Sequence, residues 1–265
     1  MGALRHISLS ALPKFLLSRT TGLLTRTRLP HALRPRLYRW FARRYGVDLD
    51  EVDGELEDFE SLAKFFCRSL KRGVRPIAEG EPLVSPCDGR IITAGPIQND
   101  RIEQVKGRRY SVKQLLQDTE LATRLSDGYQ ATIYLAPGDY HRVHSPLAGQ
   151  LVRVTHIPGA LFPVNPAAVD SIPDLFPRNE RVVFHLRLAN SAPAAVVMVS
   201  ALNVSDTRVT AAVGTQLELG DELGQFGFGS TTIVITPHSG PAIMEMPREQ
   251  RVWMGAALQS EESAS

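Results

Sequence analysis

The feature that most constrains the fold is a series of short β-rich runs that fills the chain from Leu83 onward. Glycine, proline, asparagine and aspartate stand between these runs, as expected where strands end and turns form. The pattern predicts an α+β protein with a mostly antiparallel sandwich or barrel-like core, preceded by N-terminal amphipathic helices. Residues 111–116 are expected to form a short helix, and residues 58–70 a longer one. The predicted strands cover residues 90–93, 130–135, 150–156, 181–188, 194–204, 208–213 and 230–236.

The first 47 residues are strongly basic. They contain ten Lys or Arg and no Asp or Glu, which leaves 20 basic and 28 acidic residues in the rest of the chain. Leucine, phenylalanine and tryptophan are interleaved with the charges, a mixture typical of amphipathic helices in a bilayer interface. Each Lys or Arg among anionic headgroups contributes about 1 kcal/mol to membrane binding, and salt weakens this contribution.

Other interpretations of this basic segment are nucleic-acid binding, a transit peptide, or a helix pair packed on its own protein. Pro13, Pro30 and Pro35 interrupt the segment, and with its many charges they argue against a transmembrane helix of ~20 residues. It also lacks the uninterrupted apolar run of ~7 to 15 residues that a secretory signal requires. We therefore expect a peripheral rather than a spanning protein.

Length and composition agree with a compact enzyme that carries an attachment region. A chain of 265 residues suits one large or two small domains, and its apolar fraction of 43% supplies a substantial core. Cys67 and Cys87 are the only cysteines, too few for a disulfide framework, so a reducing compartment is expected. The predicted organisation is a membrane-associating helical region over 1–47, a catalytic domain over 48–258 and a disordered tail over 259–265.

Three residues from separate motifs, Asp88, His144 and Ser230, supply an acid, a base and a hydroxyl. A serine nucleophile needs a base within reach and a carboxylate that holds the tautomer of that base, wherever the three lie in sequence. Each motif alone is weak, because an Asp-Gly pair is usually a turn. His141 and His144 lack the Cys or acidic neighbours of a metal site, so no metal is predicted. The glycine-rich run 224–231 lacks the lysine of a Walker motif, which argues against nucleotide binding.

Three short motifs are weak signals singly, but their occurrence together in one chain is specific for a protein family. Tyr-His-Arg-Val-His stands at 140–144, Pro-Gly-Ala-Leu-Phe-Pro-Val-Asn at 158–165 and Gly-Ser-Thr at 229–231. In this order, over nearly the whole chain, they resemble the phosphatidylserine decarboxylases. The sequence departs from the family pattern at Phe228, where leucine is usual, and at Cys87, where alanine is usual. Both residues remain apolar. In this family the chain cleaves itself after the glycine that follows residue 228, so the Phe228 departure is expected to change the rate of this maturation rather than prevent it.

The resemblance implies a pyruvoyl-dependent lyase of the membrane-associated bacterial type. Such an enzyme converts phosphatidylserine to phosphatidylethanolamine and CO2 in phospholipid biosynthesis. The resemblance also implies a zymogen that cleaves itself between Gly229 and Ser230. The products would be a β chain, residues 1–229, and an α chain, residues 230–265, which stay together as a heterodimer.

In this chemistry four residues have predicted roles, three of them from the triad above and one, His141, chosen because it stands close to His144. Asp88, His144 and Ser230 would form the charge-relay triad for self-cleavage. Ser230 would then become the covalent pyruvoyl cofactor, which forms a Schiff base with the serine headgroup and acts as an electron sink. His141 is the candidate proton donor in decarboxylation, although residues three apart in a strand point to opposite faces unless the backbone turns. The expected partners are a phospholipid and a membrane surface, on the cytoplasmic face of the cell membrane, and no nucleic acid.

Three alternatives remain open. A serine hydrolase that uses Asp88, His144 and Ser230 without self-cleavage would keep one intact chain. A nonenzymatic membrane-binding protein would also stay intact and would not depend on these side chains. A pyruvoyl decarboxylase for another serine-headed lipid or a soluble amino acid would cleave normally, and the basic, apolar N-terminus favours a lipid.

Overall fold

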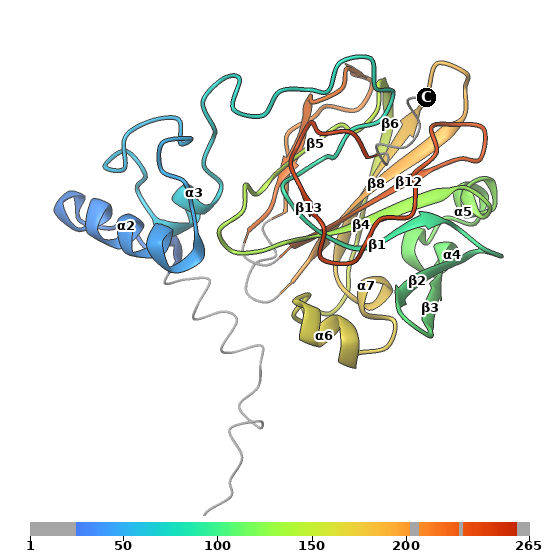
Figure 1. Ribbon diagram of the computed structural model, residues 1–265, viewed down its shortest axis with the longest axis horizontal. Helices are drawn as coiled ribbons and strands as arrows, with labels where there is room; N and C mark the ends of the chain where they lie inside the picture. The colour runs from blue at the N-terminus through green and yellow to red at the C-terminus, as the bar shows by residue number, and fades with distance from the viewer. Residues whose placement is uncertain (1–24, 202–206, 228–229, 259–265) are drawn as a thin grey trace, which may run out of the picture.

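The computed structural model describes residues 25–201, 207–227 and 230–258. Its main body is an eight-stranded sheet in which every neighbouring pair of strands is antiparallel (Figure 1). The curled antiparallel sheet and the small number of helices confirm the predicted fold class. In sheet order the strands are β10 (Gln216–Leu217), β6 (Gly149–Ile157), β7 (Arg181–Arg187), β8 (Pro193–Ser200), β12 (Ser230–Thr236), β4 (Tyr129–Leu135), β1 (Gly89–Pro96) and β13 (Arg251–Val252).

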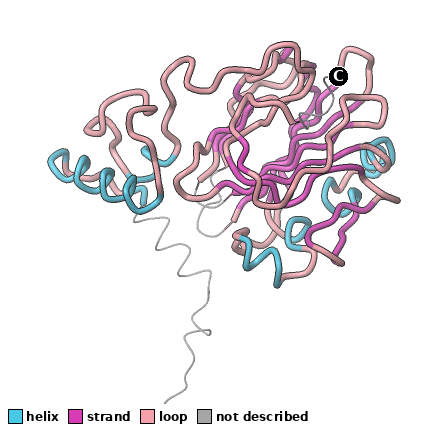
Figure 2. Tube along the Cα trace, viewed as in Figure 1, coloured by secondary structure: helices cyan, strands magenta, loops and turns pink. Residues whose placement is uncertain are grey.

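Further elements cover both faces of this sheet, and Figure 2 shows the helices at its periphery. One face packs against a three-stranded sheet, in the order β5 (Arg142–His144), β11 (Glu222–Gln225) and β9 (Arg208–Val209). A hairpin and four short helices pack on the other face. These elements are β2 (Arg101–Val105), β3 (Arg108–Ser111), α4 (Val112–Leu116), α5 (Thr119–Leu125), α6 (Pro166–Ser171) and α7 (Leu175–Arg178).

Strand β12 is buried along its whole length because it lies between two apolar cores. Val234 belongs to the core under the three-stranded sheet, whereas Ile233 and Ile235 belong to the core under the helices. This alternation follows from the two-residue period of a strand. Burial on both faces fixes the register of β12, since a slip by one residue would exchange the two sets of side chains. Ser230, its first residue, is therefore held in the middle of the sheet.

The N-terminal part forms a separate small core on one side of the sheet (Figure 1). It contains the 3-10 helix η2 (His31–Leu33), α2 (Arg34–Tyr45) and α3 (Leu62–Phe66). Tyr38 of α2 stacks on Phe65 of α3 with ring centroids 4.6 Å apart, and the Tyr38 hydroxyl donates to the Phe59 carbonyl at 2.6 Å. Helix α2 thus shares a core with residues 59–66. None of the helices within the described ranges has the length and apolar character needed to cross a bilayer.

Most predicted strands correspond to observed ones with shifted ends, and α4 confirms the short helix. Two predictions are wrong. The helix expected over 58–70 is only α3, because Ser61 caps its start and the chain then turns to pair Leu70 with Val52. The strand expected over 208–213 is only β9. Several predictions fall on residues outside the described ranges: the tail at 259–265, residues 1–24 of the basic region, the end of the strand predicted over 194–204, and Phe228 with Gly229.

Candidate active site

Ser230 is completely buried at the first position of β12. Its neighbours across the sheet are Leu135 on β4 and Ser200 on β8. The Ser230 hydroxyl donates to the carbonyl of Gly227 at 3.4 Å, so the side chain turns back toward the segment that precedes it. The nucleophile of the predicted cleavage is thus held by the sheet on one side, and its hydroxyl faces the Gly227 carbonyl on the other.

Asp88 precedes β1 and lies at the same end of the sheet as Ser230. Strands β1 and β12 are both antiparallel to β4, which lies between them, so they start at the same end. Arg90 and Thr231 both oppose Tyr134, which puts the two strand starts in register. Two strand spacings, about 10 Å, separate these starts. The fold therefore brings the predicted acid and the predicted nucleophile to the same end of two strands that flank β4.

The carboxylate of Asp88 is almost fully buried and is held by Arg75. Arg75 donates to both carboxylate oxygens, at 3.0 and 2.8 Å, and the Met254 amide donates to one of them at 2.9 Å. Arg75 also pairs with Glu51 at 2.9 Å. Burial alone lowers the pKa of Arg75, but its hydrogen bonds to Asp88 and Glu51 outweigh burial and raise the pKa. Pairing of this kind is what allows charged groups to remain in a protein interior.

His144 ends β5, with its ring between two polar partners. Nδ1 lies 2.7 Å from the Gly220 carbonyl, and Nε2 lies 3.0 Å from the Tyr140 hydroxyl. Because a carbonyl only accepts, we assign the proton to Nδ1, which leaves Nε2 as an acceptor. Burial lowers the pKa of His144 and outweighs the opposing effect of the Gly220 hydrogen bond. His144 is therefore a neutral imidazole with a lone pair on Nε2, the form that a general base requires.

His141 is completely buried just before β5. Its Nδ1 donates to the Asp139 carbonyl at 2.8 Å, and Nε2 has no hydrogen-bond partner among the described residues. The ring lies against Phe66 of α3, with centroids 3.9 Å apart. Burial, and secondly the charge of Arg68, lower the pKa of His141 to about 3. Its carbonyl accepts the Phe226 amide at 2.9 Å, which links His141 to the segment that leads to Ser230.

The structure gathers the predicted site residues in one region but does not join the triad by hydrogen bonds. Asp88 contacts Arg75, His144 contacts Gly220, and Ser230 contacts Gly227. Over residues 25–201, 207–227 and 230–258, no hydrogen bond connects any two of the three triad side chains. The nearest link is a backbone one, from the His144 amide to the carbonyl of Pro86 at 2.8 Å. The charge-relay arrangement remains a prediction. No group of three or more His, Cys, Asp or Glu in those ranges is placed to hold a metal ion.

Two residues of the site were missed by sequence reasoning. Tyr140 is the partner of His144, and burial raises its pKa to about 12, so it stays a neutral hydroxyl at neutral pH. Tyr140 could have been found from the sequence, because it is the first residue of the Tyr-His-Arg-Val-His motif. Arg75 is the partner of Asp88, and no local pattern marks it. Burial raises the pKa of Cys87, consistent with a packed rather than a reactive thiol.

Comparison with known proteins identifies the family of this chain. The sequence profile described as Phosphatidylserine decarboxylase matches residues 62–260. The chain is 43% identical to the phosphatidylserine decarboxylase proenzyme of Pseudomonas aeruginosa strain PAO1 over 248 residues, which cover 84% of this chain and 85% of that protein. It is 40% identical to the proenzyme of Anaeromyxobacter sp. strain K, over 86% of this chain and 87% of that one. These matches confirm the resemblance found in the motifs: the chain belongs to the phosphatidylserine decarboxylase family.

Proposed function

We propose that this protein decarboxylates phosphatidylserine to phosphatidylethanolamine after cleaving itself between Gly229 and Ser230. The observation that carries the proposal is the position of Ser230. Its hydroxyl is buried at the start of β12 and turned toward the preceding segment. The Phe226 amide of that segment donates a hydrogen bond to the His141 carbonyl.

In maturation, His144 takes the proton of the Ser230 hydroxyl as the oxygen attacks the Gly229 carbonyl. The amide becomes an ester and frees the Ser230 nitrogen. Loss of the α-proton then expels the Gly229 carboxylate and leaves dehydroalanine at the start of the new chain. Tautomerisation, addition of water and loss of ammonia give the pyruvoyl group. Asp88 has the role of favouring the charged form of His144 during the first step, because a nearby carboxylate stabilises an imidazolium.

The residues present fit a pyruvoyl group at position 230. The group is made from the chain itself, so β12 would hold it at the same buried position. A cavity of about 560 Å³ reaches Gly227, three residues before this position. A pyruvoyl group supplies an electron sink for the pair left behind by departing CO2. His141, with a buried Nε2 that has no partner within the described residues, is our candidate for protonating the former α-carbon.

Cleavage need not separate the two chains. Strand β12 belongs to the shorter product, but both of its neighbours, β4 and β8, belong to the longer one. All seven residues of β12 are buried between them and the two cores. We infer that the products remain one heterodimer, because removal of the short chain would expose both cores.

Three measurements on the purified wild-type protein test this function. Intact mass under denaturing conditions should give two chains split between Gly229 and Ser230, the shorter one with a blocked N-terminus. The same sample should elute as one species from a native sizing column. It should also release CO2 from phosphatidylserine in detergent micelles. A single intact chain in active material would refute the pyruvoyl mechanism and favour a serine hydrolase.

Membrane attachment is proposed from the outer face of α2. Tyr38 and Phe41 belong to the small core and Ala42 is buried, whereas Trp40 is 52% exposed. Helical spacing puts the exposed Arg36 and Arg43 beside Trp40, and the exposed Arg39 lies three residues after Arg36 and four before Arg43. An aromatic ring surrounded by arginines suits the headgroup layer of an anionic bilayer, and we assign this face to the cytoplasmic surface of the cell membrane.

We expect Arg36→Gln/Arg39→Gln/Arg43→Gln to lower the partition coefficient for vesicles of phosphatidylcholine and phosphatidylglycerol by at least tenfold, since each charge contributes about 1 kcal/mol. Vesicle sedimentation at low and high salt measures the effect, which should shrink at high salt. The matched control is a triple substitution of exposed arginines away from α2, Arg90→Gln/Arg101→Gln/Arg187→Gln. Equal loss of binding in both triple variants would show that net charge, not this face, is responsible.

A further inference from the structure

Two hollows adjoin beside the cleavage segment. One, of about 560 Å³, is lined by α3, the end of β11 and Gly227. The other, of about 380 Å³, lies between α3, β5 and β11. They share part of their lining, so they form one continuous recess that reaches Gly227, three residues before Ser230. The shared residues are Glu60, Lys64, Cys67, Arg208 and Gln225.

The basic side chains of this recess differ in whether an acid neutralises them. Arg142 pairs with Glu222 at 2.8 Å, and Arg28 pairs with Glu60 at 3.2 Å. Lys64 and Arg208, both exposed, have neither a hydrogen bond nor an ion pair from their side chains to any described residue. The remaining acids of the lining are Asp53 and Asp58, and Asp58 accepts the Glu55 amide.

Lys64 and Arg208 flank the approach to the candidate catalytic groups. Lys64 lies two residues before Phe66, whose ring packs on His141. Arg208 opposes Gln225 on β11, two residues before Gly227. Opposed residues of antiparallel strands present their side chains on one face, and Arg208 lines both hollows. The two cations thus reach the same recess from different elements.

A third cation lies behind them. Arg68 is only 4% exposed and lines the second hollow. Its Nη2 donates to the carbonyls of Gly138 and Asp139, but Nε and Nη1 have no partner among the described residues. Burial lowers the pKa of Arg68 to about 10, so it stays charged at neutral pH. Buried donors without partners are rare in native proteins, and they point to a ligand or water that completes the site.

We propose that Lys64 and Arg208, with Arg68 behind them, bind the phosphate of the substrate headgroup. The inference rests on the proposed function, since a serine phospholipid presents an amine, a carboxylate and a phosphodiester within a few bonds of one another. The amine must reach position 230, and the carboxylate is lost. The phosphodiester is unchanged by the reaction. Contacts to it therefore stabilise the bound substrate and the transition state equally, which lowers KM and leaves kcat unchanged.

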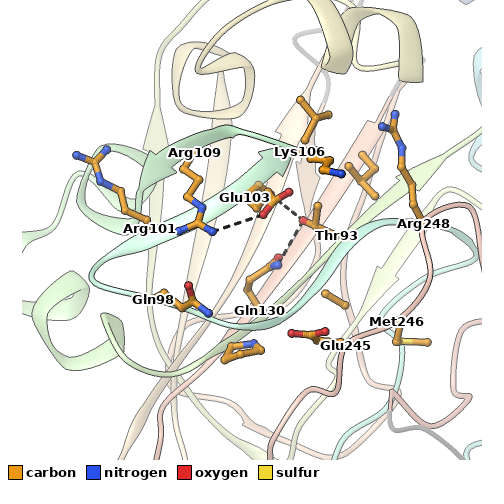
Figure 3. A pocket seen from close by; sticks show the side chains of 14 residues that line it. Thr93, Gln98, Arg101, Glu103, Lys106, Arg109, Gln130, Glu245, Met246 and Arg248 are labelled. Carbon is orange, nitrogen blue, oxygen red and sulfur yellow. Dashed lines mark hydrogen bonds and ion pairs between the residues drawn. The ribbon is translucent and has the colours of Figure 1, made fainter.

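A second basic hollow, shown in Figure 3, is the matched control. It has a volume of about 390 Å³, and Arg101, Lys106, Arg109 and Arg248 surround it. Its floor includes Gln130, which opposes Ile235, five residues along β12 from Ser230. Five strand residues span about 17 Å. A headgroup bound there would not bring its amine to position 230.

The test measures steady-state CO2 release by the mature enzyme from short-chain phosphatidylserine below its micellar concentration, so that surface binding plays no part. We expect a rise in KM of about tenfold for Lys64→Ala or Arg208→Ala and a larger rise for the double variant, as for loss of hydrogen bonds to a charged group. Inhibition by O-phospho-L-serine should weaken in parallel, whereas inhibition by L-serine should not. Arg101→Ala/Lys106→Ala, the control pair, should keep the wild-type KM. Complete self-cleavage of every variant verifies folding.

The outcomes separate the inference from the function on which it rests. No CO2 release by a cleaved wild-type enzyme would overturn both. Wild-type turnover with an unchanged KM in the double variant would overturn the phosphate site alone. Equal inhibition by inorganic phosphate and by O-phospho-L-serine would also overturn the phosphate site, because the site would then bind free phosphate rather than the headgroup. A defect seen on anionic vesicles but absent with the short-chain substrate would assign the two cations to the membrane surface and would also overturn the inference.

Discussion

Ser230→Ala is expected to abolish self-cleavage and leave one intact chain, close to the 29.2 kDa of the full sequence. The expectation follows from the chemistry, since the Ser230 oxygen forms the ester that replaces the Gly229 amide and no other hydroxyl can become residue 230. Without cleavage there is no pyruvoyl group, so CO2 release should fall below detection. Intact mass under denaturing conditions and a CO2 assay measure the two effects.

Ser200→Ala is the matched control for this experiment. Ser200 opposes Ser230 on the neighbouring strand, is almost fully buried, and shares a hydrogen bond with Thr207 rather than with the cleavage segment. Removal of the Ser200 hydroxyl tests whether the loss of any buried hydroxyl next to Ser230 stops self-cleavage. We expect the variant to cleave. An uncleaved Ser200→Ala, or a cleaved Ser230→Ala, would contradict the assignment of the nucleophile.

The pH dependence of self-cleavage carries further information about the base. Burial lowers the pKa of His144, so its neutral form persists to a pH below the usual histidine range. A general base works in its neutral form. The cleavage rate should therefore stay level through neutral pH and fall only below about pH 6.5, the ordinary histidine pKa. A rate that already falls on going from pH 8 to pH 7 would point to a base other than this imidazole.

The sequence predicted the sheet well because strand signals are local. The run of β-branched residues after Gly229 predicted a strand from Ser230 onward, and β12 confirms it, with all of its residues buried. The helix over 58–70 was predicted too long for the opposite reason. Helical spacing of Phe59, Leu62, Phe65 and Phe66 is local, whereas the pairing of Leu70 with Val52 that ends the helix is tertiary.

The candidate site was also predicted only as far as local sequence signals allow. Residue types that bear chemistry identified Asp88, His144 and Ser230, but their partners come from distant segments. Arg75 reaches Asp88 from the loop after α3, and Gly220 reaches His144 from the turn before β11. Hydrogen-bond partners of this kind depend on the packed fold, so no spacing in the chain predicts them.

The relation between His141 and His144 illustrates how the fold resolves an ambiguity of sequence. A continuous strand would point the two rings to opposite faces. Strand β5 begins only at Arg142, so His141 lies outside it. The two rings have different partners, Asp139 and Phe66 for His141, and Gly220 and Tyr140 for His144. Separate environments allow separate roles, and this leads to the prediction that maturation and turnover can be uncoupled.

His141→Asn is expected to cleave normally and to lower kcat for decarboxylation by about 10²- to 10⁴-fold, the usual contribution of a general acid. The asparagine amide can replace the Nδ1 donor to the Asp139 carbonyl while it removes Nε2, so the fold loses less than in His141→Ala. Intact mass reports maturation, and CO2 release reports turnover. Failure of His141→Asn to cleave, or near wild-type kcat in the cleaved variant, would contradict the role.

The pH profile of kcat distinguishes an acid from a structural residue. With a pKa of about 3, His141 is neutral at rest, and as an acid it must first gain a proton. The protonated fraction falls as pH rises above the pKa, so kcat should fall with increasing pH. Anionic groups of a bound substrate raise that pKa by favouring the imidazolium, which moves the fall toward neutral pH. The descending limb should be present in the wild type and absent in His141→Asn, because asparagine does not titrate there. A limb that persists in the variant would assign the proton to another group, and His144 would then be the next to test.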